Sequence, residues 1–168
     1  KIYFPREVLP IATVTSAFVN MILTFIVVFG VVIIAGRGIH IHAMLCLPIV
    51  MIVEYILCLG IALIVSSITV YLRDLQYILG IFVMALQYLT PVMYGVDMVE
   101  NSGAGYWLVF LFNLNPMTPI IRIYRQIIYY GEVPELHSLI LALIVGIVFI
   151  VIGEVMFKKL QKGFAEEF

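Results

Sequence analysis

Few side chains in this sequence are of the types that do chemistry, and they are scattered along the chain. Glu54 lies inside a long apolar stretch, His40 and His42 are two residues apart, and Cys46 and Cys58 are twelve residues apart. A metal site needs more converging ligands than two histidines provide. If their stretch is helical, the two cysteines are about 18 Å apart, beyond the reach of a disulfide bond. We therefore predict no metal site and no disulfide, and we interpret both cysteines as small apolar packing residues.

The sequence also lacks the patterns of common enzyme classes. It contains no Gly-x-x-x-x-Gly-Lys-Ser/Thr loop of the kind that holds the phosphates of ATP. Neither a Ser/His/Asp set nor a Cys/His pair falls on a plausible common face, so we predict no catalytic residue. No basic patch suggests nucleic acid as a partner. An ATP-driven activity would therefore need a separate subunit that binds ATP and Mg²⁺, and we expect no cofactor on this chain.

The composition is that of a membrane protein. Hydrophobic residues make up 64% of the 168 residues and charged residues only 11%, whereas charged residues average roughly 25% in soluble proteins. Four long apolar stretches lie at about residues 10–35, 43–70, 77–94 and 138–157. About twenty apolar residues in a helix cross a hydrocarbon core about 30 Å thick. We predict an all-α integral membrane protein with four transmembrane helices in a single domain, residues 1–168.

The positive charges predict how these spans are oriented. Six of the nine Lys and Arg residues lie at the two ends of the chain and in the link at residues 71–76, and cytoplasmic segments carry an excess of these residues. Both ends are then cytoplasmic, and the segments at 36–42 and 95–131 are external. Only Arg37, Arg122 and Arg125 oppose the rule.

Two acidic residues fall within the spans. An ionised carboxylate is costly in a bilayer and normally faces the interior of the bundle or water. Glu54, in the second span, either lines a translocation path or is protonated and hydrogen-bonded between helices. Glu154 lies near the cytoplasmic end of the last span, where we expect it to pair with Lys158 four residues later.

The segment between the third and fourth spans is too apolar for a loop in water. Residues 106–114 are apolar but too short to cross, and residues 119–130 read as a second helix, with Thr118 as its N-cap, Pro119 at its first position and Gly131 just past its end. Its apolar face is opposed by polar residues; the apolar set is Ile120, Ile123, Tyr124, Ile127 and Ile128, and the polar set is Arg122, Arg125 and Gln126. We predict an external re-entrant helical hairpin over about residues 95–131 that packs on the bundle or lines a water-filled path.

Four segments, in order, resemble one family of transporters. They are residues 1–10 (Lys-Ile-Tyr-Phe-Pro-Arg-Glu, then Leu9-Pro10), 71–77 (Tyr-Leu-Arg-Asp-Leu-Gln-Tyr), 115–119 (Asn-Pro-Met-Thr-Pro) and 164–168 (Phe-Ala-Glu-Glu-Phe). The chain resembles ABC-2-type permeases, and more narrowly those that export O-antigen, teichoic acid and related polysaccharides. Members of that family carry two further spanning helices before the first of these segments. The resemblance implies that this chain holds the last four of six helices.

The resemblance also implies partners and a location. It implies a homodimer that works with two copies of an ABC ATPase subunit, which binds the ATP and Mg²⁺. The substrate would be a lipid-linked glycan, moved across the cytoplasmic membrane of a bacterium or archaeon. The residues at or near the ATPase contact would be Phe4, Pro5, Arg6, Glu7, Arg73 and Asp74. The alternative is that Arg6 and Arg73 are ordinary positive-inside anchors, with Glu7 and Asp74 as their local partners.

A glycan exporter can use aromatic rings as the lining of its path, because the C–H faces of sugars stack on them. The expected path residues are Phe18, Phe25, Glu54, Tyr55, Tyr88 and Tyr94, and the expected external gate residues are Asn115, Pro116, Thr118, Pro119, Arg122 and Arg125. The competing explanation for the outer aromatic residues is the aromatic belt found at membrane interfaces. The two gate arginines either meet lipid or substrate phosphates or face solvent.

The sequence therefore predicts the permease subunit of an ATP-driven exporter of a lipid-linked polysaccharide. A second interpretation is a permease of the same architecture that exports a drug or a small lipid. A third is a membrane enzyme acting on polyprenyl-linked substrates, which would need clustered acidic or histidine residues that the sequence does not supply.

Overall fold

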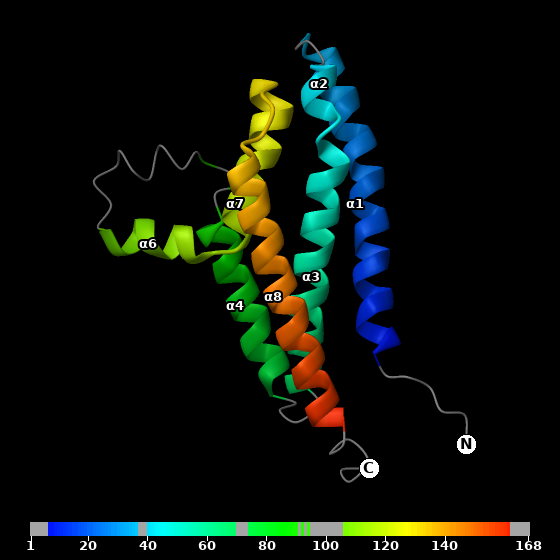
Figure 1. The fold of residues 1–168 in the computed structure, drawn as a ribbon, viewed down its shortest axis with the longest axis vertical. Helices are drawn as coiled ribbons and strands as arrows, with labels where there is room; N and C mark the ends of the chain where they lie inside the picture. The colour runs from blue at the N-terminus through cyan, green and yellow to red at the C-terminus, as the bar shows by residue number, and fades with distance from the viewer. Residues whose placement is uncertain are drawn as a thin grey trace.

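The computed structural model describes residues 7–36, 40–69, 74–90, 92, 94 and 106–161. Every regular element in these ranges is a helix, which confirms the predicted all-α class. The helices are α1 (Val8–Ile34), α2 (Ile41–Met44), α3 (Leu47–Thr69), α4 (Leu75–Leu89), α6 (Tyr106–Leu114), α7 (Met117–Arg125), the π-helix η1 (Gln126–Tyr130) and α8 (Leu136–Gln161). In Figure 1, α1, α3, α4 and α8 run along the long axis and α6 lies across it. We name the upper end in that view, which contains α2 and η1, the α2 end, and the lower one, where α8 finishes, the α8 end.

Three of the helices are long and apolar enough to cross a membrane. They cover Val8–Ile34, His42–Thr69 and Leu136–Leu160, close to three of the four predicted spans. The helix in the remaining predicted span, α4, has only 15 residues and ends at Leu89, five residues before the predicted end of that span at Tyr94. It ends there because Thr90 precedes Pro91, and the residue before a proline is pushed out of the helical region; the Thr90 backbone is extended, with φ −92° and ψ 127°. A fourth crossing stays a prediction.

The centre of the bundle is the α3–α8 pair, whose backbones come into close contact at glycines. A Cβ atom on Gly60 of α3 would lie 2.6 Å from backbone atoms of Phe149 and Ile150. A Cβ on Gly153 of α8 would lie 2.9 Å from the Gly60 carbonyl oxygen, and one on Gly146 would lie 3.1 Å from the Ile56 side chain. Small residues allow such an approach, which is a common way for membrane helices to associate. Side chains larger than hydrogen do not fit at Gly60 without moving a helix.

The helical segment α7–η1 packs on α3 toward the α2 end. Ile120, Ile123 and Ile127 are buried there, and Tyr124 and Ile128 are partly buried. This confirms the apolar face expected from the sequence. The α3 side of the same core consists of Leu47, Val50, Val53 and Leu57.

The start of α7 differs from the prediction. Thr118 is not the N-cap, because the helix begins at Met117 and Pro116 occupies the cap position. Asn115 is the residue that satisfies the first turn: its side-chain oxygen accepts a hydrogen bond from the Met117 N–H (3.0 Å) and its carbonyl accepts one from the Thr118 N–H (3.1 Å). Pro119 then falls in the first turn, where a missing N–H costs little.

The end of this segment is as predicted. Gly131 follows η1 directly and has a φ of +69°, a left-handed conformation that favours glycine. The ring of His40 lies against it, since a Cβ atom on Gly131 would come within 1.9 Å of that ring. The exposed His40 side chain therefore lies against the end of η1.

The outer surface is strongly apolar. No side chain of α1 is buried, and Val27 and Ile34 are 66% and 86% exposed. Such a surface is stable only against lipid or against another apolar chain.

We expect Gly60→Ala to destabilise the protein strongly, because the added methyl group meets the α8 backbone. The free energy of unfolding in detergent should fall by about 1–3 kcal/mol, the usual effect of overpacking. The matched control is Gly30→Ala on α1, where a Cβ meets no atom within 4 Å; it should change stability by less than about 1 kcal/mol. Equal effects of the two substitutions would contradict the close α3–α8 contact.

Candidate functional site

A pocket of about 460 Å³ lies between α1 and α3 and contains the only acidic residue of α3. Three predicted path residues, Phe18, Glu54 and Tyr55, line it. The other lining side chains are apolar or weakly polar: Val14, Ala17, Met21 and Cys58. The site is therefore an apolar pocket with one carboxyl group in its wall.

Two contacts hold α1 against α3 beside this pocket. The rings of Phe18 and Tyr55 have centroids 4.9 Å apart and are tilted by 52°. The hydroxyl groups of Tyr55 and Thr15 are 2.8 Å apart, within hydrogen-bond distance. Because Tyr55 follows Glu54 directly, these contacts also fix the part of α3 that carries the carboxyl group.

Glu54 connects the pocket to α7. The Tyr124 hydroxyl donates a hydrogen bond of 2.6 Å to Oε2 of Glu54, and the Tyr124 ring lies 5.4 Å from that of Phe25 on α1. Burial, together with the nearby Glu54 carboxyl group, raises the pKa of the Tyr124 hydroxyl, so it keeps its proton and remains a donor. Three helices thus meet near one carboxyl group, and Glu54 makes a hydrogen bond between helices, as in one of the two alternatives expected for it.

Tyr124 belongs to this site through its bond to Glu54 and is not among the path residues predicted from the sequence. A signal was available: a tyrosine on the buried face of a helix needs a partner for its hydroxyl, and Glu54 is a carboxyl group within a span that needs a donor. The sequence could not show that α7 packs beside this part of α3.

The other two predicted path residues lie at a different place. Tyr88 and Tyr94 line a smaller pocket of about 220 Å³ at the end of α4. The Tyr94 hydroxyl donates a hydrogen bond to the Tyr88 carbonyl, and its ring meets Phe112 of α6 edge-on at 5.8 Å. The six predicted path residues therefore form two groups: Phe18, Phe25, Glu54 and Tyr55 in one, and Tyr88 and Tyr94 in the other.

Two of the predicted gate residues tie α7 to the end of α4. The side-chain amide of Asn115 donates a hydrogen bond of 2.8 Å to the Thr90 hydroxyl. One nitrogen of Arg125 donates to the carbonyl oxygens of Tyr94 (3.0 Å) and Val92 (3.4 Å). Arg125 therefore binds protein backbone, an outcome that the sequence analysis had not considered.

The remaining predicted gate residues line a third pocket, between α7 and α8. They are Pro116, Thr118, Pro119 and Arg122, and Asn115 lines it as well. Thr118 is buried, Arg122 is exposed, and the prolines are half-buried.

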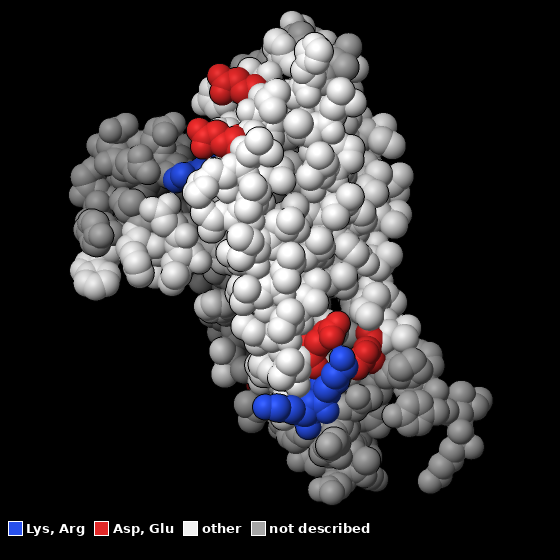
Figure 2. All heavy atoms as spheres, in the orientation of Figure 1, with Lys and Arg blue, Asp and Glu red and all other residues white. Residues whose placement is uncertain are grey.

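Most of the predicted coupling residues, namely Phe4, Pro5, Arg6 and Arg73, lie outside the described ranges. Glu7 and Asp74 are described, immediately before α1 and α4. At the α8 end, Lys158 and Glu154 form the predicted pair, with 3.2 Å between nitrogen and oxygen. Figure 2 shows basic and acidic side chains gathered at this lower end and a long uncharged surface above it.

Comparison with known proteins identifies the family. The sequence pattern of ABC-2 type transporters matches residues 1–129. The chain belongs to this family. It is therefore a multi-pass membrane protein, which accounts for the apolar surface of α1.

Two curated relatives align with almost the whole chain. An O-antigen export system permease protein RfbA of Klebsiella pneumoniae is 27% identical over 166 residues, which are 99% of this chain and 62% of that protein. A protein of the same name from Myxococcus xanthus is 26% identical, with the same coverage. The chain thus spans 62% of the length of these relatives.

The hydrogen bond between Glu54 and Tyr124 should be measurable as a coupling energy. We expect a double-mutant cycle of Glu54→Leu and Tyr124→Phe, read from unfolding free energies in detergent, to give about 1–3 kcal/mol, because each single change leaves the other polar group without its partner. Pairing Glu54→Leu with Tyr130→Phe, an exposed tyrosine at the end of η1, should give no coupling. Additive effects in the first cycle would show that the bond does not hold α7 on α3.

Proposed function

We propose that this chain forms part of the permease of an ATP-driven exporter that moves a lipid-linked polysaccharide across the cytoplasmic membrane. The observation that carries the proposal is the alignment of 99% of the chain with two permeases named for O-antigen export. The site adds support, because the rings of Phe18 and Tyr55 and the carboxyl group of Glu54 line the pocket between α1 and α3, and Phe25 and Tyr124 meet nearby.

The chemistry of that site suits a sugar chain. The rings of Phe18, Tyr55 and Phe25 offer apolar surfaces to the C–H faces of sugars. Glu54 offers an acceptor to a sugar hydroxyl. The Tyr124 hydroxyl occupies Oε2 of the same carboxyl group, so a sugar hydroxyl that replaces it there removes one contact between α7 and α3.

In this proposal the segment from α6 to α7 is a re-entrant hairpin that gates the path. Its position supports the idea, since α7 contacts α3 through Tyr124 and contacts the end of α4 through Asn115 and Arg125. Moving α7 away would break these bonds together and uncover the site beside Glu54.

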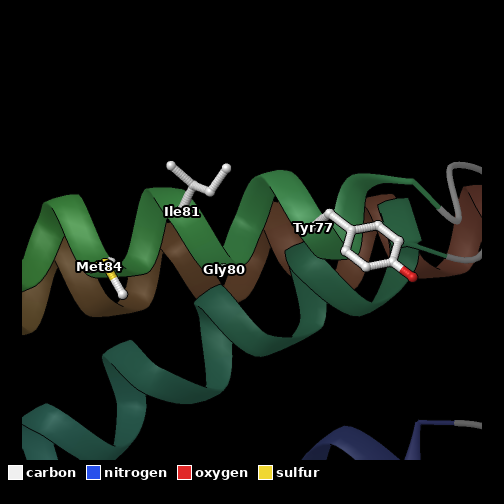
Figure 3. A pocket seen from close by; sticks show the side chains of 4 residues that line it. All are labelled: Tyr77, Gly80, Ile81 and Met84. Atoms are coloured by element: carbon white, nitrogen blue, oxygen red, sulfur yellow. The ribbon is translucent and has the colours of Figure 1, made fainter.

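We further propose four crossings, with both ends cytoplasmic. The surface of α4 supports a membrane location for this short helix: Tyr77, Ile81 and Met84 are 80%, 73% and 64% exposed. With Gly80 they border a shallow hollow of about 430 Å³ (Figure 3). We propose that a second copy of the chain completes the path, and that two copies of a separate ATPase, with ATP and Mg²⁺, drive it through residues 4–7, Arg73 and Asp74.

One observation is also compatible with a different cargo. The pocket between α1 and α3 is of limited size and mostly apolar, which suits a drug or small lipid as well as a stretch of glycan. The two cargoes predict different consequences of losing the protein.

In the native host, deletion of the gene should abolish display of a surface polysaccharide, and the full-length protein should restore it. Phe18→Ala combined with Tyr55→Ala should reduce display at least tenfold, an order-of-magnitude expectation from the loss of two stacking rings at about 1 kcal/mol or more each. The control is Ile26→Ala, an exposed position on α1, which should restore display fully. Normal polysaccharide display in the deletion strain, with loss of resistance to a hydrophobic compound, would favour the second cargo.

Coupling to the ATPase can be tested by charge reversal. We expect Arg6→Glu with Arg73→Glu to remove the stimulation of the partner's ATPase activity by the permease, because exposed charges set the register of a docked partner. The control is Lys158→Glu, which reverses a basic charge in the last turn of α8 and should leave that stimulation unchanged. Unchanged ATPase activity and assembly in the double variant would rule out the assignment of these residues.

A further inference from the structure

The pocket between α7 and α8 is separate from the Glu54 site and has a volume of about 540 Å³. Polar side chains from three helices line one part of it, and α8 supplies an apolar wall. The lining includes Asn113, Thr118, Arg122, Ser138, Leu141, Val145 and Phe149. A pocket with polar groups in one part and an apolar wall in another suits an amphiphilic ligand.

Thr118 is the unusual residue in this pocket. It is 2% exposed, and its hydroxyl has no hydrogen-bond partner in the described part of the chain. The other five threonines each donate to the carbonyl four residues earlier, and they are Thr13, Thr15, Thr24, Thr69 and Thr90. Thr118 has no such acceptor, because the residue four positions earlier, Leu114, belongs to α6 and precedes the break at Asn115. A buried hydroxyl group without a hydrogen-bond partner in the protein needs an explanation, and a bound ligand that accepts its hydrogen bond is one.

Two of the other polar groups, Arg122 and Ser138, lie toward the α2 end of the groove, whereas Asn113 and Asn115 precede Thr118 in the chain. Arg122 is one helical turn beyond Thr118, about 6 Å closer to the α2 end. Ser138 is in the first turn of α8, which begins at the same end (Figure 1). The guanidinium group has five N–H donors, so it can serve a ligand in addition to partners within the protein.

The apolar wall runs from this polar level toward the middle of the bundle. Leu141, Val145 and Phe149 are four residues apart and therefore lie on one face of α8. From Ser138 to Phe149 the wall extends about 16 Å along the helix. This is a surface on which an acyl chain can lie.

We propose that this groove binds a glycerophospholipid from the leaflet at the α2 end. Its phosphate lies at Arg122, an ester carbonyl accepts the hydrogen bond of the Thr118 hydroxyl, and one acyl chain follows the α8 wall. The order of the protein groups matches the order of the lipid groups, which run from phosphate to ester to hydrocarbon. The site does not depend on which cargo is exported.

The charges around the groove argue for an ordinary phospholipid over a lipid pyrophosphate. Glu132 and Glu135 are exposed at the α2 end of the molecule, and Figure 2 shows acidic side chains on the upper left, next to a basic one. Two carboxylates repel a pyrophosphate more than the single charge of a phosphodiester. They also favour an amine headgroup, as in phosphatidylethanolamine.

The test is lipid binding to the full-length protein in detergent, measured by native mass spectrometry with added phosphatidylethanolamine. Thr118→Val keeps the shape of the side chain and removes the hydroxyl, so binding should weaken about fivefold, the effect of one hydrogen bond. Thr118→Ser and Thr24→Val should bind as the unchanged protein does. The ether-linked analogue, which has no ester carbonyl, should bind to the unchanged protein as weakly as the ester lipid binds to Thr118→Val.

A second arm tests the phosphate. Arg122→Gln should weaken binding of the ester and ether lipids alike, and diacylglycerol, which has no phosphate, should bind equally to Arg122→Gln and to the unchanged protein. Equal binding of the ester lipid to Thr118→Val and to the unchanged protein would overturn the proposal, as would tighter binding of an isoprenoid pyrophosphate than of the phospholipid. Melting temperatures of all variants identify any that fail to fold, and if Thr118→Val is one of them, the comparison of ester and ether lipids on the unchanged protein still tests the hydroxyl contact.

Discussion

The rest of the structure depends on the backbone contact between α3 and α8. Lipid is as apolar as the helices, so no hydrophobic force brings membrane helices together, and close packing has to supply the attraction. Gly60, Gly146 and Gly153 provide it because they place no side chain of their own between the two helices. With one face of α3 occupied by α8, its other faces are left for α1 and α7. Glu54 lies where those faces meet.

The outer helices are held differently. α1 has no buried side chain and is joined to α3 by the Phe18–Tyr55 ring contact and the Thr15–Tyr55 hydrogen bond. Besides the isoleucine contacts, α7 is joined by one hydrogen bond to Glu54 and others to the end of α4. A few polar contacts can break and re-form at modest cost, whereas a glycine-based backbone contact is lost only by separating the helices. The bundle therefore combines a glycine-packed α3–α8 pair with an α1 that meets α3 through Tyr55 and an α7 that is held by both isoleucine packing and hydrogen bonds.

Local rules in the sequence were enough to predict several features. The apolar face of α7, the glycine after η1 and the Glu154–Lys158 pair all depend on residues within a few positions of one another. The end of α4 at Leu89 also follows a local rule, because Pro91 keeps Thr90 out of the helical region. The prediction of a span to Tyr94 was based on hydropathy and did not apply this rule. The Glu54–Tyr124 bond joins residues seventy positions apart, and no periodicity contains that information. The same holds for the separation of Tyr88 and Tyr94 from the other path residues.

The pairing of Glu54 with Tyr124 also limits how the proposed exporter can work. A carboxyl group in an apolar wall needs a donor at all times, because leaving it without one costs more than any single bond returns. While α7 is in place, Tyr124 is that donor. When α7 moves, water or a sugar hydroxyl has to take the place of Tyr124, and of the two only the sugar also covers the Phe25 ring that Tyr124 leaves. A glycan therefore stabilises the open arrangement more than water does, so occupancy of the path and displacement of α7 favour each other. An apolar cargo lacks a hydroxyl for Glu54 and would leave the carboxyl group to water, which makes the hairpin harder to open for that cargo than for a sugar.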